Sequence, residues 1–118
     1  MFELPVAVDL LSALAHEARL KAFRLLVRAG NQGLSAGELA GHLGLRPTAA
    51  SFHLGRLRQA GLVHRRRAGQ QIFYSADFDS IRALRAFLDR ECCADAPDGC
   101  GPECGAAARA DTLVETST

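Results

Sequence analysis

The sequence predicts a mainly α-helical domain that carries one β-hairpin. Residues 17–29 repeat apolar side chains with a helical period. Two short segments on either side of Gly44 have the composition of a helix pair joined by a tight turn, and two strand-like runs flank Gly69. The length of 118 residues suits about one domain with a modest core, and small domains often gain stability by forming dimers.

The first half of the chain predicts four helices. Residues 5–15 form a short apolar helix, and residues 17–29 form a second one that Gly30 ends. Ser35 and Glu38 have the spacing of a capping box, which opens a third helix running to about residue 43. Pro47 suits the first turn of a fourth helix, which ends near Gly61.

The second half predicts a hairpin, a last helix and a tail. Residues 62–67 and 71–76 read as two strands, and Asp77 or Asp79 would cap a helix over residues 78–92. After Cys93 the residues are small, acidic, or Gly and Pro, a composition that cannot form a packed core. We therefore expect a folded domain over residues 1–93 and a flexible tail over residues 94–118.

The charge is divided along the chain although the net charge is only +1. Residues 46–76 contain six arginines and no acid, whereas from Asp77 onward nine acids face four bases. A basic centre between neutral and acidic ends indicates a surface for a polyanion, although a solvated arginine face is the alternative.

Two short helices around a glycine-containing turn, the second rich in Thr, Ser, His and Arg, match a helix-turn-helix, and the hairpin after them matches a wing. The predicted fold class is thus a mainly α winged helix-turn-helix, with its second helix in the major groove of double-stranded DNA. The candidate DNA-binding residues are Thr48, Ser51, Phe52, His53, Arg56, Arg65, Arg67 and Gln70.

Each candidate also has a structural interpretation. Ser51 and Arg56 suit a solvated helix surface, and His53 lies beside a core leucine and suits packing. Because the side chains of residues 65–67 alternate between the faces of a strand, at least one of these arginines should serve the sheet rather than DNA.

The segments LSALAHEARLKAFRLL and LSAGELAGHLGLRPTAASFHLGRLRQAGLVHRRRAGQQIFYSA resemble the winged helix-turn-helix repressors of the ArsR/SmtB superfamily over about residues 11–88. The resemblance implies a homodimer that pairs through its first and last helices and binds a palindromic operator. It implies that an effector releases the DNA. It also implies recognition-helix contacts at Thr48, Ser51, Phe52 and His53, and a wing tip at residues 67–70.

All four cysteines lie near one end, at Cys92, Cys93, Cys100 and Cys104. The chain has neither a signal-peptide pattern nor a membrane-length apolar run, so we expect a cytoplasmic protein with reduced thiols. Soft thiolates select thiophilic ions. Three of them, from Cys92, Cys93 and Cys100, suit trivalent arsenic or antimony, which take pyramidal three-sulfur coordination.

Several effectors remain open at this point. Participation of Cys104 would complete a four-sulfur site for zinc, cadmium or lead, and a thiol redox switch would use the same cysteines. The cysteine pair with a third cysteine after the last helix also resembles a subset of arsenic-responsive repressors in this superfamily. Two other sites known in the superfamily lack their ligands here, because residues 37–45 contain no cysteine and residues 78–91 no histidine.

Two further classes are weaker interpretations. A metal-storage protein would use the tail but would not need the arginine-rich centre. An enzyme with Cys93 as nucleophile and His64 or His53 as base would have its residues scattered across a DNA-binding pattern. We therefore expect no enzyme and no catalytic residue.

Overall fold

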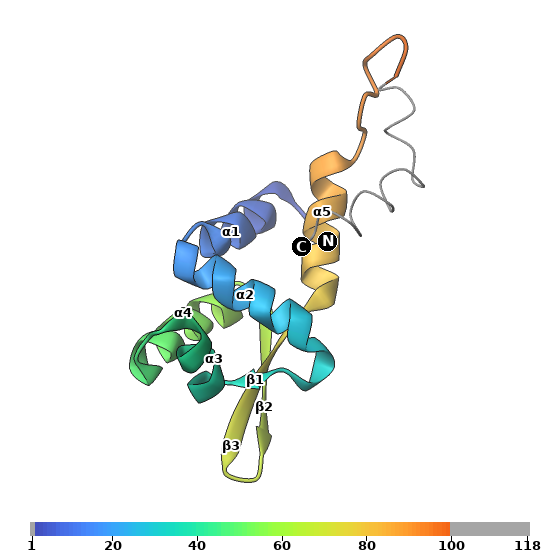
Figure 1. Cartoon of the computed structure of the whole chain (residues 1–118). Helices are drawn as coiled ribbons and strands as arrows, with labels where there is room; N and C mark the ends of the chain where they lie inside the picture. Colours follow the sequence, from blue (N-terminus) through green and yellow to red (C-terminus); the bar gives the residue numbers. More distant parts are fainter. Residues whose placement is uncertain (1, 100–118) are drawn as a thin grey trace. The chain divides into compact units, whose positions relative to one another are not determined.

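The computed structural model describes residues 2–99. Its elements, labelled in Figure 1, are α1 (Leu4–Leu14), α2 (Glu17–Ala29), the 3-10 turn η1 (Gly30–Gln32), β1 (Leu34–Ser35), α3 (Ala36–Leu43), α4 (Pro47–Gln59), β2 (Val63–Ala68), β3 (Gln71–Ala76) and α5 (Phe78–Asp89). The predicted winged helix-turn-helix is confirmed. No described helix is long and apolar enough to cross a membrane.

The predicted helix ends agree closely with the structure where the sequence carries a cap. The Ser35 hydroxyl accepts from the Glu38 N–H at 3.1 Å, and Glu38 Oε1 accepts from the Ser35 N–H at 2.8 Å. Gly30 ends α2, Pro47 opens α4, and Gly44 turns the chain between α3 and α4 with φ +68°. That φ lies in the left-handed region, which glycine adopts without steric cost.

The hairpin is part of a three-stranded antiparallel sheet with the order β1-β3-β2. The sequence did not predict β1, which has only two residues and pairs Leu34 with Tyr74. Gly33, just before β1, runs so close to the Tyr74 carbonyl that any Cβ at this position would clash with it. Beyond this pairing, β2 and β3 project from the helices as a two-stranded wing (Figure 1).

The core lies between the helices and the base of the wing. Its fully buried large side chains are leucines contributed by α1, α2, α3, α4 and the turn before β2, namely Leu10, Leu26, Leu39, Leu54, Leu57 and Leu62. Because α4 contributes two of them at a spacing of three residues, the recognition helix is fixed with one face inward and the other exposed.

The start of α5 is hydrogen-bonded to the turn after α4 and lies against the wing; we call these contacts the α5 clamp. The Asp77 N–H donates to the Leu62 carbonyl at 2.8 Å, and the Ser80 hydroxyl donates to the Gly61 carbonyl at 2.8 Å. Asp77 Oδ1 accepts from the Ser80 N–H, while Asp77 Oδ2 lies 3.1 Å from His64 Nε2 on β2. Of the two candidate caps for this helix, Asp77 is the one used.

The last helix is shorter than the sequence predicts, since α5 ends at Asp89 and the expectation was residue 92. Glu91 and Cys93 have φ values of 65° and 62°, which no α-helix accommodates. The chain divides into two compact units, the first ending at Leu88 and the second beginning at Asp89. The expected domain boundary was Cys93.

Candidate nucleic-acid interface

The first half of α4 presents small polar side chains and one aromatic ring to solvent. We call the exposed side of this helix the outer face of α4; it consists of Thr48, Ser51, Phe52, Gly55, Arg58 and Gln59. Three predicted DNA-binding residues lie on it, and Phe52 is 71% exposed. This end of a recognition helix is the part that reaches base edges in a helix-turn-helix.

Two other predicted DNA-binding residues of α4 contact side chains of other helices. Arg56 is half-buried, and its guanidinium lies 3.3 Å from the Asp9 carboxylate on α1. His53 is half-buried on the side that α4 turns toward the core, and its Nδ1 is buried with no hydrogen-bond partner. This placement favours the packing interpretation of His53 over a DNA contact, because residue 53 shares a helix face with Ala50 and Leu57.

The His53 ring packs against His16, which caps the N-terminus of α2. The ring centroids are 4.7 Å apart, and His16 Nδ1 accepts a hydrogen bond from the Ala18 N–H at 3.2 Å. Burial lowers the pKa of His53 from 6.5, and the nearby His16 and Arg19 lower it further. A neutral His53 therefore belongs to the stable packing of α4 on α2.

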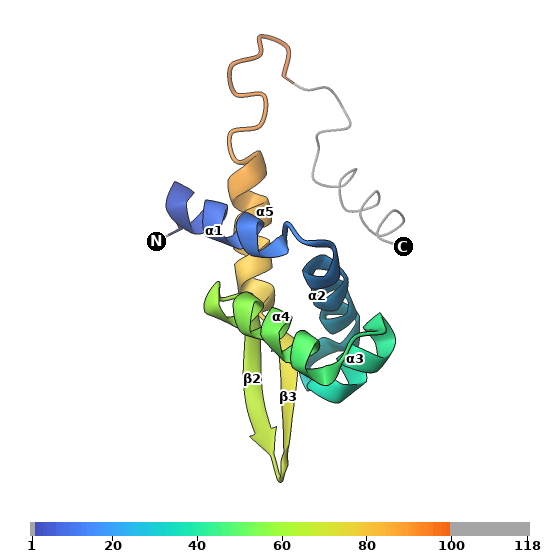
Figure 2. The same ribbon diagram turned by 90° about the vertical axis from the view of Figure 1, so that its left-hand side faces the viewer.

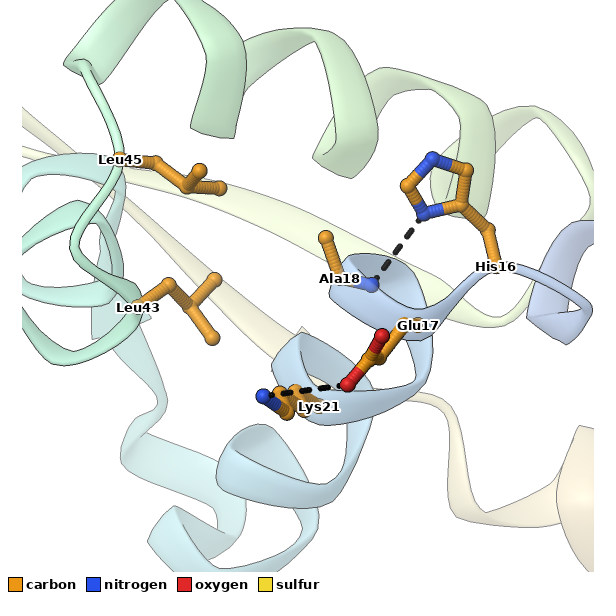
Figure 3. Close-up of a pocket in the computed structure, with 6 residues that line it drawn as sticks. All are labelled: His16, Glu17, Ala18, Lys21, Leu43 and Leu45. Atoms are coloured by element: carbon orange, nitrogen blue, oxygen red, sulfur yellow. Dashed lines mark hydrogen bonds and ion pairs between the residues drawn. The ribbon is translucent and has the colours of Figure 1, made fainter.

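A pocket of about 300 Å³ lies beside this cap, between the start of α2 and the end of α3. Figure 3 shows the His16–Ala18 hydrogen bond and the Glu17–Lys21 ion pair on one side of it, and Leu43 and Leu45 on the other. The lining contains no cysteine, so the thiol chemistry that the sequence predicts does not belong here.

All three arginines of the wing are exposed, and Arg66 also makes contacts within the protein. The Arg66 guanidinium lies 5.1 Å from the centre of the Phe73 ring, its cross-strand neighbour, and donates to the Gln32 carbonyl at 2.9 Å. Arg66 therefore serves the sheet, which confirms that one of the three would do so. Arg65 and Arg67 are exposed, and the turn residue Gln70 is exposed at the wing tip.

Exposed apolar side chains also lie on α1 and near the end of α5; we call these residues together the α1–α5 face. Its members are exposed by between 43% and 64%, and they are Leu4, Val8, Leu11 and Leu88. The Phe2 ring, just before α1, lies 5.5 Å from the Phe87 ring on α5, centroid to centroid, and in the view of Figure 2 α1 crosses in front of α5. Covering these apolar side chains with another protein surface would remove them from water.

Of the four cysteines, the structure describes Cys92 and Cys93. Their Sγ atoms are 3.5 Å apart, and Cys93 is disulfide-bonded. Because a disulfide bond is about 2.05 Å long, Cys92 is not its partner. Cys100 and Cys104, the predicted third ligand and the optional fourth, lie outside the described residues.

Within residues 2–99, no three side chains among His, Cys, Asp and Glu gather closely enough to hold a metal ion. The described pair of adjacent cysteines supplies two sulfur atoms. Two sulfurs that each lie about 2.3 Å from one ion can be at most about 4.6 Å apart, so a 3.5 Å separation is compatible with a shared thiophilic ion once both thiols are reduced.

Known helix-turn-helix proteins are similar to this chain in sequence. A family model described as a helix-turn-helix domain matches residues 14–66. The chain is 39% identical over 87 residues to the HTH-type transcriptional regulator YgaV of Escherichia coli, covering 74% of this chain and 86% of that protein. It is 39% identical over 87 residues to the transcriptional activator HlyU of Vibrio cholerae, covering 74% and 78%.

Solved structures of transcriptional regulators also resemble this chain. Reduced HlyU matches with a TM-score of 0.58 at 37% identity, covering 75% of this chain and 90% of HlyU. A homodimeric winged helix-turn-helix DNA-binding domain from Mycobacterium bovis, described as a possible ArsR-family regulator, matches with a TM-score of 0.61 at 27% identity, covering 71% and 76%. A possible transcriptional regulator for arsenical resistance matches with a TM-score of 0.61 at 34% identity, covering 69% and 81%.

Proposed function

Because this chain belongs to the ArsR/SmtB superfamily of winged helix-turn-helix transcriptional regulators and is not an enzyme, we propose that it is a repressor that binds operator DNA as a homodimer. One observation carries the proposal. The outer face of α4 presents Thr48, Ser51 and Phe52 to solvent, next to a wing whose Arg65 and Arg67 are exposed. Short polar side chains on a recognition helix read bases, and the arginines neutralise phosphates.

The homodimer would pair through the α1–α5 face, so that two copies of α4 meet two half-sites about one DNA turn apart. Val8→Lys places a charge on this face and should shift the protein from dimer to monomer in sedimentation equilibrium and weaken operator binding. The matched control is Leu20→Lys, which changes a 44% exposed leucine on α2 and should leave the dimer intact. A dimer that survives Val8→Lys would contradict this choice of interface.

We further propose that the effector is trivalent arsenic or antimony, bound by Cys92, Cys93 and Cys100. The adjacency of Cys92 and Cys93, whose Sγ atoms lie 3.5 Å apart with Cys93 in a disulfide, supports a shared thiophilic centre once that disulfide is reduced. Ligand binding would draw these three cysteines together after α5 and favour the form that does not bind DNA. To release an operator, it needs to bind that form more tightly, and typical couplings are about 1 to 3 kcal/mol.

A second candidate effector is the thiol redox state, and a specific observation favours it. Cys93 is disulfide-bonded in the structure, and a disulfide sulfur cannot act as a thiolate ligand. One of the similar solved structures is named for its reduced form. In this proposal an oxidant releases the operator, and arsenite in the presence of excess reductant does not. A cadmium, lead or zinc site that includes Cys104 is the remaining alternative.

Fluorescence anisotropy with labelled operator duplex separates these effectors. In excess reductant, arsenite should release wild-type protein, should not release a Cys92→Ser/Cys93→Ser variant, and should release the Cys104→Ser control as it does the wild type. Arsenite release of the double variant would contradict the site. Release by diamide alone would support the redox switch, and failure of Cys104→Ser to respond would favour a four-sulfur site.

A further inference from the structure

Phe52 is the one large apolar side chain on the outer face of α4. It is 71% exposed, more than any other large hydrophobic residue that the structure describes, while the other five phenylalanines of the chain are buried or half-buried. Exposing a phenylalanine costs the hydrophobic stabilisation that its burial would give. The position makes no contribution to the core that would explain an aromatic residue there.

The Phe52 ring also contacts its neighbour in the sequence. Its centroid lies 5.7 Å from that of His53 in an edge-to-face arrangement, and His53 is itself packed against His16 on α2. On the same helix face, the residues one turn before and one turn after are Thr48 and Gly55, which are both small. A flat apolar surface is thus presented at the part of α4 that would enter the major groove.

This inference rests on the proposed DNA binding and adds what this side chain recognises. A phenyl ring cannot exchange hydrogen bonds with base edges, so it cannot read guanine, adenine or cytosine through their donors and acceptors. The only apolar group that a base pair presents in the major groove is the 5-methyl of thymine. We infer that Phe52 is a specificity-determining residue that reads a thymine in each operator half-site by contact with this methyl group.

The test begins with wild-type protein and a random duplex pool, from which bound sequences are selected. Each thymine of the selected site is then replaced by deoxyuridine, which removes only the methyl group. One symmetric pair of thymines should respond, with binding weakened about fourfold for each half-site, as expected from about 0.8 kcal/mol for one buried methyl-sized group. Phe52→Leu, which keeps an apolar contact, should retain part of this difference.

Phe52→Gln is the decisive variant, because glutamine pairs with adenine through two hydrogen bonds and makes no use of a methyl group. It should bind thymine and deoxyuridine sites equally and, in a new selection, should prefer adenine at that position. Circular dichroism and the dimer state should match those of the wild type, since the side chain is exposed.

Two results would overturn the inference. Phe52→Gln could keep the wild-type preference for thymine over deoxyuridine, or no thymine of the wild-type site could respond to loss of its methyl. A wild-type protein that enriches no sequence at all would instead contradict the proposed function, so the two failures are distinguishable.

Discussion

Gly55 offers a prediction in which stability and DNA binding change in opposite directions. It lies in the middle of α4, on the outer face, one turn after Ser51 and Phe52. A Cβ added there would meet no atom of the protein within 4 Å, so packing gives no reason for a glycine. A glycine here would allow close approach of the helix backbone to another molecule, which under the proposed DNA binding is the floor of the major groove.

The magnitude follows from the helix position. Glycine in an exposed helix interior costs about 0.5 to 1 kcal/mol relative to alanine, and the open space adds no steric penalty to Gly55→Ala. The variant should therefore be more stable by that amount, which corresponds to a Tm increase of about 3 to 6 °C for a domain of this size. In the complex, the same methyl group would hold α4 away from the bases, and we expect operator affinity to fall roughly tenfold, or about 1.4 kcal/mol.

Two measurements on the same preparations check this. Thermal unfolding followed by circular dichroism gives the stability, at one fixed protein concentration because dimerisation makes Tm depend on it. Fluorescence anisotropy at fixed salt gives the affinity. The matched control is Gly41→Ala on α3, another exposed helix glycine with no atom near its would-be Cβ, which should raise the Tm without the loss of affinity.

The reasoning is refuted if Gly55→Ala binds the operator as tightly as the wild type while gaining stability. In that case the helix backbone does not approach DNA at this residue. A lower Tm would instead show that the space around Gly55 is needed for folding.

The remaining predictions concern the capping box, the histidine pair and the wing. Ser35→Ala should lower the free energy of unfolding by about 1 kcal/mol in urea denaturation, because the Glu38 N–H loses its acceptor. His53 has a lowered pKa, so its contribution to stability is present above pH 6.5 and is lost as the pH falls through the folded-state pKa; His53→Phe should flatten the Tm profile between pH 8 and 5. Arg65→Ala should weaken binding to all DNA sequences and reduce the slope of log affinity against log salt by about 1. Arg66→Ala should instead cost about 0.5 to 1.5 kcal/mol of stability, because it removes the contacts with Phe73 and the Gln32 carbonyl. If the slope of log affinity against log salt falls as much in this variant as in Arg65→Ala, the assignment of Arg66 to the sheet is contradicted.

The sequence predicts those parts of the fold that are determined locally. The bounds of α2 follow from its apolar period and Gly30, and the start of α3 follows from the capping box. The strand β1 could not be predicted, because two residues are too few to show an alternation and their partner, β3, lies about forty residues further on. The end of α5 was placed too late because no proline or glycine stops it before the chain turns at Glu91.

Part of the candidate site could also be predicted from local sequence patterns, and part could not. The exposure of Thr48, Ser51 and Phe52 follows from helical periodicity. The inward position of His53 was available from the same period, since it lies three residues after Ala50 and four before Leu57, but the residue type suggested a DNA contact. The Arg56–Asp9 ion pair joins residues 47 positions apart, and no local pattern predicts it.

The α5 clamp connects the last helix to the base of the wing. Asp77 and Ser80 hold the first turn of α5 to Gly61, Leu62 and His64, so the helix and the hairpin share one pivot. A six-residue strand reaches about 20 Å from such a pivot. A rotation of about 5° therefore moves its tip by about 1.7 Å over that reach, which is more than a 2.9 Å hydrogen bond to a phosphate tolerates. If the helix and the hairpin turn together about this pivot, a small change in the tilt of α5 moves mainly the wing tip at Gln70, and hardly moves Arg65, which directly follows His64.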